Sequence, residues 1–118
     1  MTRWHDLASL AQLEKNGRAV ARLDGREIGV VRDPESGELW ALRNRCPHHG
    51  GPLCLGSVKD REAGGLPGTY ELSSQRVLRC PWHGWEFDPR DGRCVDDPAM
   101  RVATYPVRVS EGRVEVEA

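Results

Sequence analysis

Two short segments of the chain each place one cysteine and one histidine close together. The first segment reads Cys-Pro-His-His-Gly over residues 46–50, and the second reads Cys-Pro-Trp-His-Gly over residues 80–84. Thiolate and imidazole are ligands for zinc and for iron–sulfur clusters, so the two segments together offer a Cys2His2 metal set. The candidate ligands are Cys46, His48, Cys80 and His83.

The order of the ligands narrows the choice of metal. In zinc fingers, cysteine is usually paired with cysteine and histidine with histidine along the chain. Here each segment supplies one of each, as is needed when one iron of a two-iron cluster takes both cysteines and the other takes both histidines. The pattern therefore favours a 2Fe-2S cluster, and a structural zinc site is the alternative.

The two segments and their flanks resemble the cluster loops of Rieske-type ferredoxins, the small electron carriers of ring-hydroxylating oxygenase systems. The stretch 41–53 resembles the first cluster loop with the strand that leads into it, and 80–88 resembles the second. The resemblance extends over about residues 4–117. It implies an all-β fold, namely a Rieske-type antiparallel β-sandwich or barrel with a cluster-binding subdomain at one tip.

The resemblance also implies a cofactor, a ligand set and partners. One Rieske 2Fe-2S cluster is expected, with Cys46 and Cys80 on one iron and His48 and His83 on the other. The expected electron donor is a flavin- or NADH-linked reductase, and the expected acceptor is a terminal oxygenase. The chain itself would carry out no substrate chemistry.

Four positions indicate where in the Rieske range the potential lies. High-potential Rieske proteins carry an extra cysteine in each loop, where this chain has Gly51 and Trp82. They also carry a serine and a tyrosine after the second ligand pair, where this chain has Trp85 and Phe87. In high-potential relatives the two extra cysteines form a disulfide, and the serine and tyrosine hydroxyls donate hydrogen bonds to sulfur. Because this chain has neither, the resemblance predicts a reduction potential of about −150 mV, at the low end of the range for Rieske proteins.

Two other functions for a chain with this cluster stay open. The chain could be the small Rieske subunit of a nitrite-reductase-like or oxygenase complex, or a redox-sensing Rieske protein. The stretch 57–76 makes the spacing between the loops longer than is usual for the family, and it is interpreted as an inserted hairpin or loop. It is the one sequence feature that hints at a specialised interface.

Length and composition set further expectations. A chain of 118 residues is expected to form one domain over 1–118, with cluster loops at about 44–56 and 79–88. The net charge of −1 gives no indication of a nucleic-acid or anionic-membrane partner. No apolar run of membrane length and no signal segment is recognised, so a cytoplasmic protein is expected, for which a monomer would suffice.

The rest of the chain consists of short strands separated by turns. Leu7, Leu10 and Leu13 recur at a spacing of three, which predicts one or two helical turns within 6–17. Alternating apolar residues and turn signals predict strands elsewhere. These strands cover residues 18–23, 27–32, 38–42, 75–79, 105–109 and 113–117.

Two cysteines and two tryptophans are left to assign. A reducing cytosol argues against a disulfide between Cys54 and Cys94, and both are expected to be small buried residues. Trp85 is expected to seat the second loop by packing. Trp82, between two candidate ligands, is the better candidate for a docking contact.

Overall fold

The structure is a computed structural model that describes residues 2–47, 50–60, 76–82, 84–95, 97 and 99–118. Within these residues the fold is built mostly of β-strands, with one short α-helix and one 3-10 turn. The elements are β1 (Trp4–Ser9), α1 (Leu10–Asn16), β2 (Arg18–Leu23), β3 (Arg26–Arg32), β4 (Leu39–Arg43), η1 (Leu53–Leu55), β5 (Ser57–Asp60), β6 (Arg76–Arg79), β7 (Glu86–Phe87), β8 (Thr104–Tyr105), β9 (Val107–Ser110) and β10 (Arg113–Glu117).

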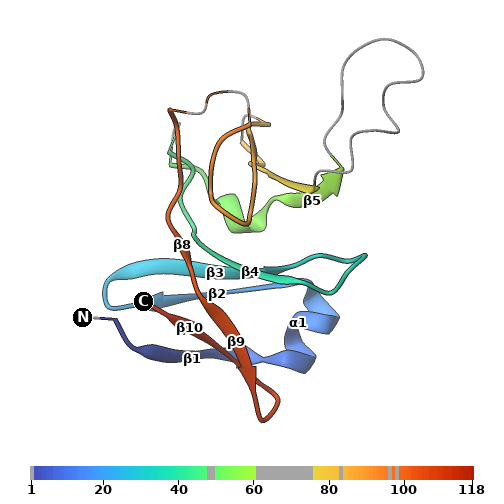
Figure 1. Ribbon diagram of the computed structural model, residues 1–118, viewed down its shortest axis with the longest axis vertical. Coiled ribbons are helices and arrows are strands. Elements are labelled where there is room, and N and C mark those ends of the chain that lie inside the picture. Colours follow the sequence, from blue (N-terminus) through green and yellow to red (C-terminus); the bar gives the residue numbers. More distant parts are fainter. Residues whose placement is uncertain (1, 48–49, 61–75, 83, 96, 98) are drawn as a thin grey trace.

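The described strands form three antiparallel sheets. The first has the order β1-β10-β9, the second β2-β3-β4-β8 and the third β5-β6-β7. In Figure 1 the second sheet lies between the other two, and the loops that follow β4 and β6 gather at the upper end of the molecule. The predicted all-β antiparallel architecture with a subdomain at one tip is therefore confirmed.

The two central strands of the middle sheet, β3 and β4, are buried on both faces because they carry apolar residues at consecutive positions. Side chains alternate between the faces of a strand. On β3, Val30 belongs to a core shared with the outer sheet and α1, whereas Val31 belongs to a second core beneath the cluster loops. On β4, Ala41 and Leu42 divide between the two cores in the same way. The middle sheet thus separates two hydrophobic cores.

Tight turns fix the two hairpins of the sheets that lie away from the tip. Asp24 and Gly25 join β2 to β3 with φ angles of 49° and 79°. Glu111 and Gly112 join β9 to β10 with φ angles of 50° and 75°. Two successive residues with positive φ suit the right-handed twist of a two-residue hairpin, and Asp-Gly is a favoured pair there.

The α-helix α1 lies within the range 6–17, where the leucine spacing predicts one or two helical turns. Residues 4–9 form β1, whose Asp6 and Ala8 pair with Glu115 and Val114 of β10. The helix begins only after Ser9, whose hydroxyl oxygen accepts a hydrogen bond from the backbone N–H of Gln12 at 3.1 Å. An N-cap serine of this kind favours a helix start at the next residue. The prediction of one or two helical turns within 6–17 is thus confirmed by Leu10–Asn16, and residues 6–9 ahead of the helix belong to β1.

The strand predicted over 105–109 is divided at Pro106. Tyr105 ends β8 and pairs with Ala41 of the middle sheet, whereas Val107 begins β9 and pairs with Val116 of the outer sheet. Proline has no backbone N–H to donate to a sheet, and it commonly stands where a strand is interrupted. The chain crosses from one sheet to the next at this residue.

The segment 57–76 begins and ends as part of the third sheet. β5 pairs with β6 in a register that joins Ser57 to Arg79 and Asp60 to Arg76. The predicted hairpin is confirmed for these ends, and residues 61–75 lie outside the described residues.

Candidate metal centre

The two predicted cluster loops share one backbone geometry. In each, the cysteine N–H donates to the carbonyl of the fifth residue after it, and the glycine four residues after the cysteine donates back to the cysteine carbonyl. Two such bonds close each loop into a compact turn. The bonds are Cys46 N to Gly51 O at 2.8 Å, Gly50 N to Cys46 O at 2.7 Å, Cys80 N to Trp85 O at 2.8 Å and Gly84 N to Cys80 O at 3.0 Å.

An arginine precedes the cysteine in each loop and folds back over the glycine. Gly50 and Gly84 have φ angles of 77° and 74°, in the left-handed region that favours glycine. A Cβ added at Gly50 would lie 3.6 Å from Nε of Arg45, and one added at Gly84 would lie 2.8 Å from Nη2 of Arg79. The two loops are therefore alike in side chain as well as in backbone.

The loops meet at Gly51. Its carbonyl accepts the N–H of Cys46, and a Cβ added to it would lie 3.2 Å from Sγ of Cys80 and 2.9 Å from the ring of Trp82. Gly51 thus stands between the two cysteines. A larger residue would have to displace either the tryptophan or the sulfur.

Both cysteines are suited to hold iron. Cys46 and Cys80 are each 1% exposed, lie in the same hydrophobic core and form no disulfide. A pair of thiols from two similar loops, shielded from water, is the soft donor set that an iron–sulfur cluster requires. His48 and His83 lie outside the described residues, so the structure places two of the four predicted ligands.

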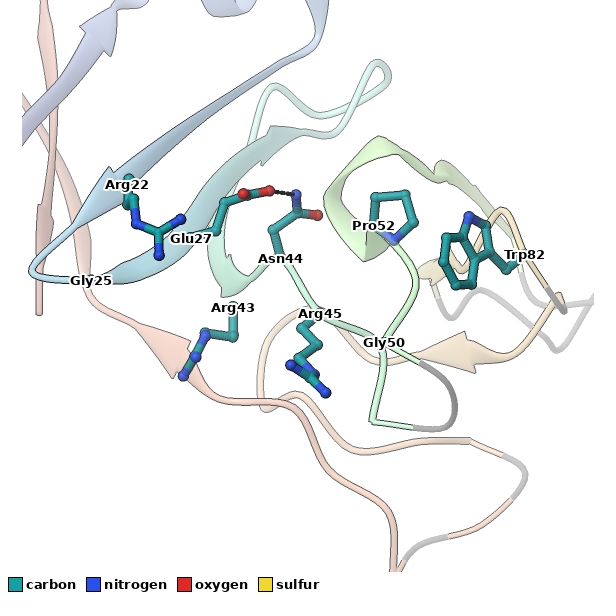
Figure 2. Close-up of a pocket in the computed structure, with 9 residues that line it drawn as sticks. All are labelled: Arg22, Gly25, Glu27, Arg43, Asn44, Arg45, Gly50, Pro52 and Trp82. Atoms are coloured by element: carbon teal, nitrogen blue, oxygen red, sulfur yellow. Dashed lines mark hydrogen bonds between the residues drawn. The ribbon is translucent and has the colours of Figure 1, made fainter.

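Asn44 ties the first loop to the middle sheet. It is 8% exposed. Its Nδ2 donates to Oε1 of Glu27 at 2.6 Å (Figure 2). Its Oδ1 accepts the backbone N–H of Cys54 at 2.8 Å. The backbone N–H of Asn44 also donates to the Glu27 carbonyl. No sequence pattern singled out this residue, because its bonding partners are distant in sequence.

Cys54 is a packing residue of the 3-10 turn η1. It is fully buried, and a Cβ added at Gly29 of β3 would lie 2.6 Å from its Cβ. Burial raises the pKa of the Cys54 thiol to about 12, which keeps it protonated. Cys94 is also buried, and none of the four cysteines forms a disulfide. The predicted burial of both residues without a disulfide is confirmed.

A buried ion pair joins the third sheet to the middle one. Arg76 of β6 donates from Nη2 to Oδ1 of Asp33 at 2.9 Å and from Nε to Oδ2 at 3.2 Å. Asp33 follows β3, and its side chain is 3% exposed. Burial opposes its ionisation, but hydrogen bonds from the Glu35 N–H and from Arg76 outweigh that effect and hold the Asp33 pKa below its usual value.

The two loop tryptophans differ in exposure. Trp85 is half-buried and packs against the core beneath the loops, as predicted. Trp82 is 58% exposed. That exposure is what a docking residue needs.

The matches with known proteins agree with this geometry. The family model of the Rieske [2Fe-2S] domain matches residues 3–106. The antiparallel sheets and the two cysteine loops at one tip agree with this match, so the class of protein is a Rieske protein. The chain belongs to the Rieske [2Fe-2S] domain family, and its cofactor is a Rieske-type 2Fe-2S cluster.

Three relatives indicate the range of proteins that use such a domain. The oxidoreductase NdmD of Pseudomonas putida is 33% identical over 95% of this chain, which spans only 18% of that protein's length. A protein described as an NADH-dependent nitrite reductase small subunit, from Mycobacterium tuberculosis, has a TM-score of 0.80 at 28% identity, covering 100% of this chain and 96% of that one. The ferredoxin of carbazole 1,9a-dioxygenase from Nocardioides aromaticivorans has a TM-score of 0.70 at 27% identity, covering 96% and 95%.

The family supports an electron-transfer role for this chain. Among the described residues, no helix is both long and apolar enough to cross a membrane.

Proposed function

We propose that this chain is a Rieske-type ferredoxin that carries one electron from a flavin- or NADH-linked reductase to an oxygenase or a related terminal enzyme. The observation that supports it most directly is the pair of matched loops, which bring Cys46 and Cys80 into one buried site at the tip of the molecule. A site at a tip suits electron exchange, because a partner can approach it closely. The similarity to a dioxygenase ferredoxin over nearly the whole of both chains agrees with this role.

The ligand assignment is part of the proposal. Cys46 and Cys80 bind one iron, and His48 and His83 bind the other. The cluster supplies reversible uptake of a single electron. Two neutral imidazoles in place of two thiolates make the site less negative, which favours reduction relative to a four-cysteine site.

The loop residues are proposed to keep the potential near the low end of the Rieske range. Phe87 is fully buried in the core beneath the loops, and it offers no hydroxyl where high-potential relatives place a tyrosine. Gly51 stands against Cys80, where the extra cysteine of a cross-loop disulfide is absent. Fewer hydrogen bonds to sulfur leave the reduced state less stabilised.

A redox titration under anaerobic conditions, followed by electron paramagnetic resonance, tests the proposal. We expect a reduced-state Rieske signal with a midpoint of about −150 mV at neutral pH. The midpoint should fall in alkali, since the imidazole protons of His48 and His83 are held less tightly in the oxidised state. Zinc in place of iron would refute the proposal, and a midpoint above zero would refute the low-potential assignment.

A second candidate is the small subunit of a nitrite-reductase-like complex. The match to a nitrite reductase small subunit, at a TM-score of 0.80 over essentially the whole of both chains, favours it. Size-exclusion chromatography of the natively isolated protein separates the two candidates. A freely cycling ferredoxin elutes near its own mass of 13.2 kDa, whereas a subunit elutes with a large partner.

A further inference from the structure

The face around Trp82 combines exposed apolar side chains with a rim of arginines. Trp82 and Leu55 are 58% and 50% exposed, which is unusual for side chains of their size. Trp82 lines two open grooves, one of about 520 Å³ on the side of the first loop and one of about 590 Å³ that it shares with Leu55. Because one side chain borders both grooves, they form a single surface.

Arginines line both grooves. Arg22, Arg43 and Arg45 surround the first groove, with Trp82 on the far side of the first cluster loop (Figure 2). Arg79 lines the second groove beside Cys80. We call the surface made by Leu55, Trp82 and these four residues the arginine face.

The guanidinium groups of this face form no close ion pair with a described carboxylate, although Glu27 stands opposite Arg22 in the β2–β3 register. No ion pair among the described residues involves Arg22, Arg43, Arg45 or Arg79. Among the described groove-lining residues the acidic one is Glu27, which accepts a hydrogen bond from Asn44. Arg76, by contrast, binds Asp33 and Asp60.

The arrangement has the composition of a protein-docking site. Tryptophan and arginine are the residues most enriched among those that carry binding energy, and such residues are typically ringed by polar ones. The whole chain has a net charge of −1, whereas the two grooves are lined by four arginines and one glutamate among the described residues, which makes this surface locally positive. A positive field of this kind attracts acidic surfaces over roughly 10 Å at 0.1 M salt.

We propose that the arginine face docks an acidic surface patch with an apolar centre, on the protein that exchanges electrons with this chain. The proposal rests on the proposed electron-transfer function and adds the chemistry of the partner's surface. Leu55 and Trp82 supply the apolar contact. The four arginines supply attraction and orientation over the loops that carry Cys46 and Cys80.

Stopped-flow oxidation of the dithionite-reduced protein tests the proposal with two defined acceptors, plastocyanin with its acidic surface and cytochrome c with its basic one. We expect the rate constant with plastocyanin to fall as salt is raised from low to moderate concentration, and the rate constant with cytochrome c to rise. The opposite signs follow from attraction in one pair and repulsion in the other.

The variant Arg45→Glu tests whether the arginine face causes this salt dependence, because it reverses one charge of that face. It should lower the ratio of the plastocyanin rate to the cytochrome c rate by about five-fold or more at low salt. A change in the protein's own potential alters the driving force toward both acceptors by the same amount, so the ratio largely removes it. Lys15→Glu is the matched control, because Lys15 is exposed on α1, on the opposite side of the middle sheet, and should leave the ratio within about two-fold.

The apolar part of the face has its own pair of variants. Leu55→Ser should slow plastocyanin reduction at high salt, where charge attraction is screened and contact area remains. Val109→Ser is the control, because Val109 is 47% exposed on β9 and lies away from both grooves.

Equal ratios for wild type, Arg45→Glu and Lys15→Glu would overturn the docking proposal. Sedimentation that detects self-association, lost in Leu55→Ser, would also overturn it by assigning the face to a second copy of the chain. In both cases an intact reduced-state Rieske signal would leave the electron-transfer function standing. Loss of that signal in the wild-type protein would refute the function itself, so the two failures are distinguishable.

Discussion

At the scale of single residues, the four cysteines divide into two kinds. Cys46 and Cys80 begin matched loops that meet at Gly51, whereas Cys54 packs against Gly29 in the interior. Exposure does not separate the two kinds, because all of these thiols are buried. What distinguishes them is the backbone geometry around each sulfur.

This division predicts opposite outcomes for two serine substitutions. Cys54→Ser should keep the visible spectrum of the cluster, and it should cost about 1–2 kcal/mol of stability, since it buries a hydroxyl in place of a thiol. Cys80→Ser should abolish or strongly alter the spectrum. Absorption spectra of anaerobically purified variants measure both effects. Bleaching in Cys54→Ser would show that the cysteines are wrongly divided.

Gly51→Ala should weaken cluster retention. The added methyl group would lie 2.9 Å from the Trp82 ring and 3.2 Å from the Cys80 sulfur, so one of the two must move. We expect a lower iron content per chain and faster bleaching in air. Gly112→Ala is the control, because its φ of 75° strains the backbone while no atom lies within 4 Å of the added group. Equal iron retention in the two variants would contradict the role of Gly51.

The sequence singles out Cys46 and Cys80 as candidate ligands. It does not single out the residues that hold their loops in place. The triplet Arg-Cys-Pro opens both loops, at residues 45–47 and 79–81, and the arginine of this repeat was not interpreted although it is visible in the sequence. Asn44 could not be found in the same way. Its partners are Glu27, seventeen residues earlier, and Cys54, ten residues later, and one sequence alone does not reveal such contacts.

At the scale of secondary-structure elements, the ion pair between Asp33 and Arg76 fixes the third sheet to the middle one. Asp33→Asn should destabilise the protein by about 1–3 kcal/mol, since Arg76 would lose a charged partner in a nearly buried position. Asp6→Asn is the matched control. Asp6 makes a similar two-point contact with Arg113, but both side chains are about half exposed, so its loss should cost less than about 1 kcal/mol.

The effect of Asp33→Asn should depend on pH in one direction. The folded-state pKa of Asp33 is depressed, so the stabilisation is fully present above the unfolded-state value of 3.8 and is lost as pH falls through the folded-state pKa. The difference in melting temperature between wild type and variant should stay constant near neutral pH and shrink in acid. A difference that grows in acid would contradict the assignment.

Boundaries of strands and helices were predicted well where a local turn ends the element. They were predicted less well where pairing with a strand distant in sequence ends it. Asp24-Gly25 fixes the β2–β3 hairpin through its own φ angles, so local sequence was enough. Residues 6–9 satisfy a helical spacing, yet they pair with β10, more than a hundred residues away. Long-range pairing of this kind overrides a weak local preference.

At the scale of the whole molecule, charge is distributed unevenly. The chain is nearly neutral overall, with arginines from the middle sheet and from the cluster loops lining two adjacent grooves beside those loops. Net charge from composition gives no indication of a nucleic-acid or membrane partner. It could not reveal the arginine face, because Arg22, Arg43, Arg45 and Arg79 are brought together only by the fold.

The division of the interior by the middle sheet bears on how the protein is made. The core between the middle sheet, the outer sheet and α1 contains no cysteine, so it can form before any iron arrives. The other core contains all four cysteines, so we expect its packing to be completed only when Cys46 and Cys80 bind the cluster. We therefore expect a newly synthesised chain to fold its cysteine-free core first. It would then present the two cysteine loops to the proteins that deliver the cluster.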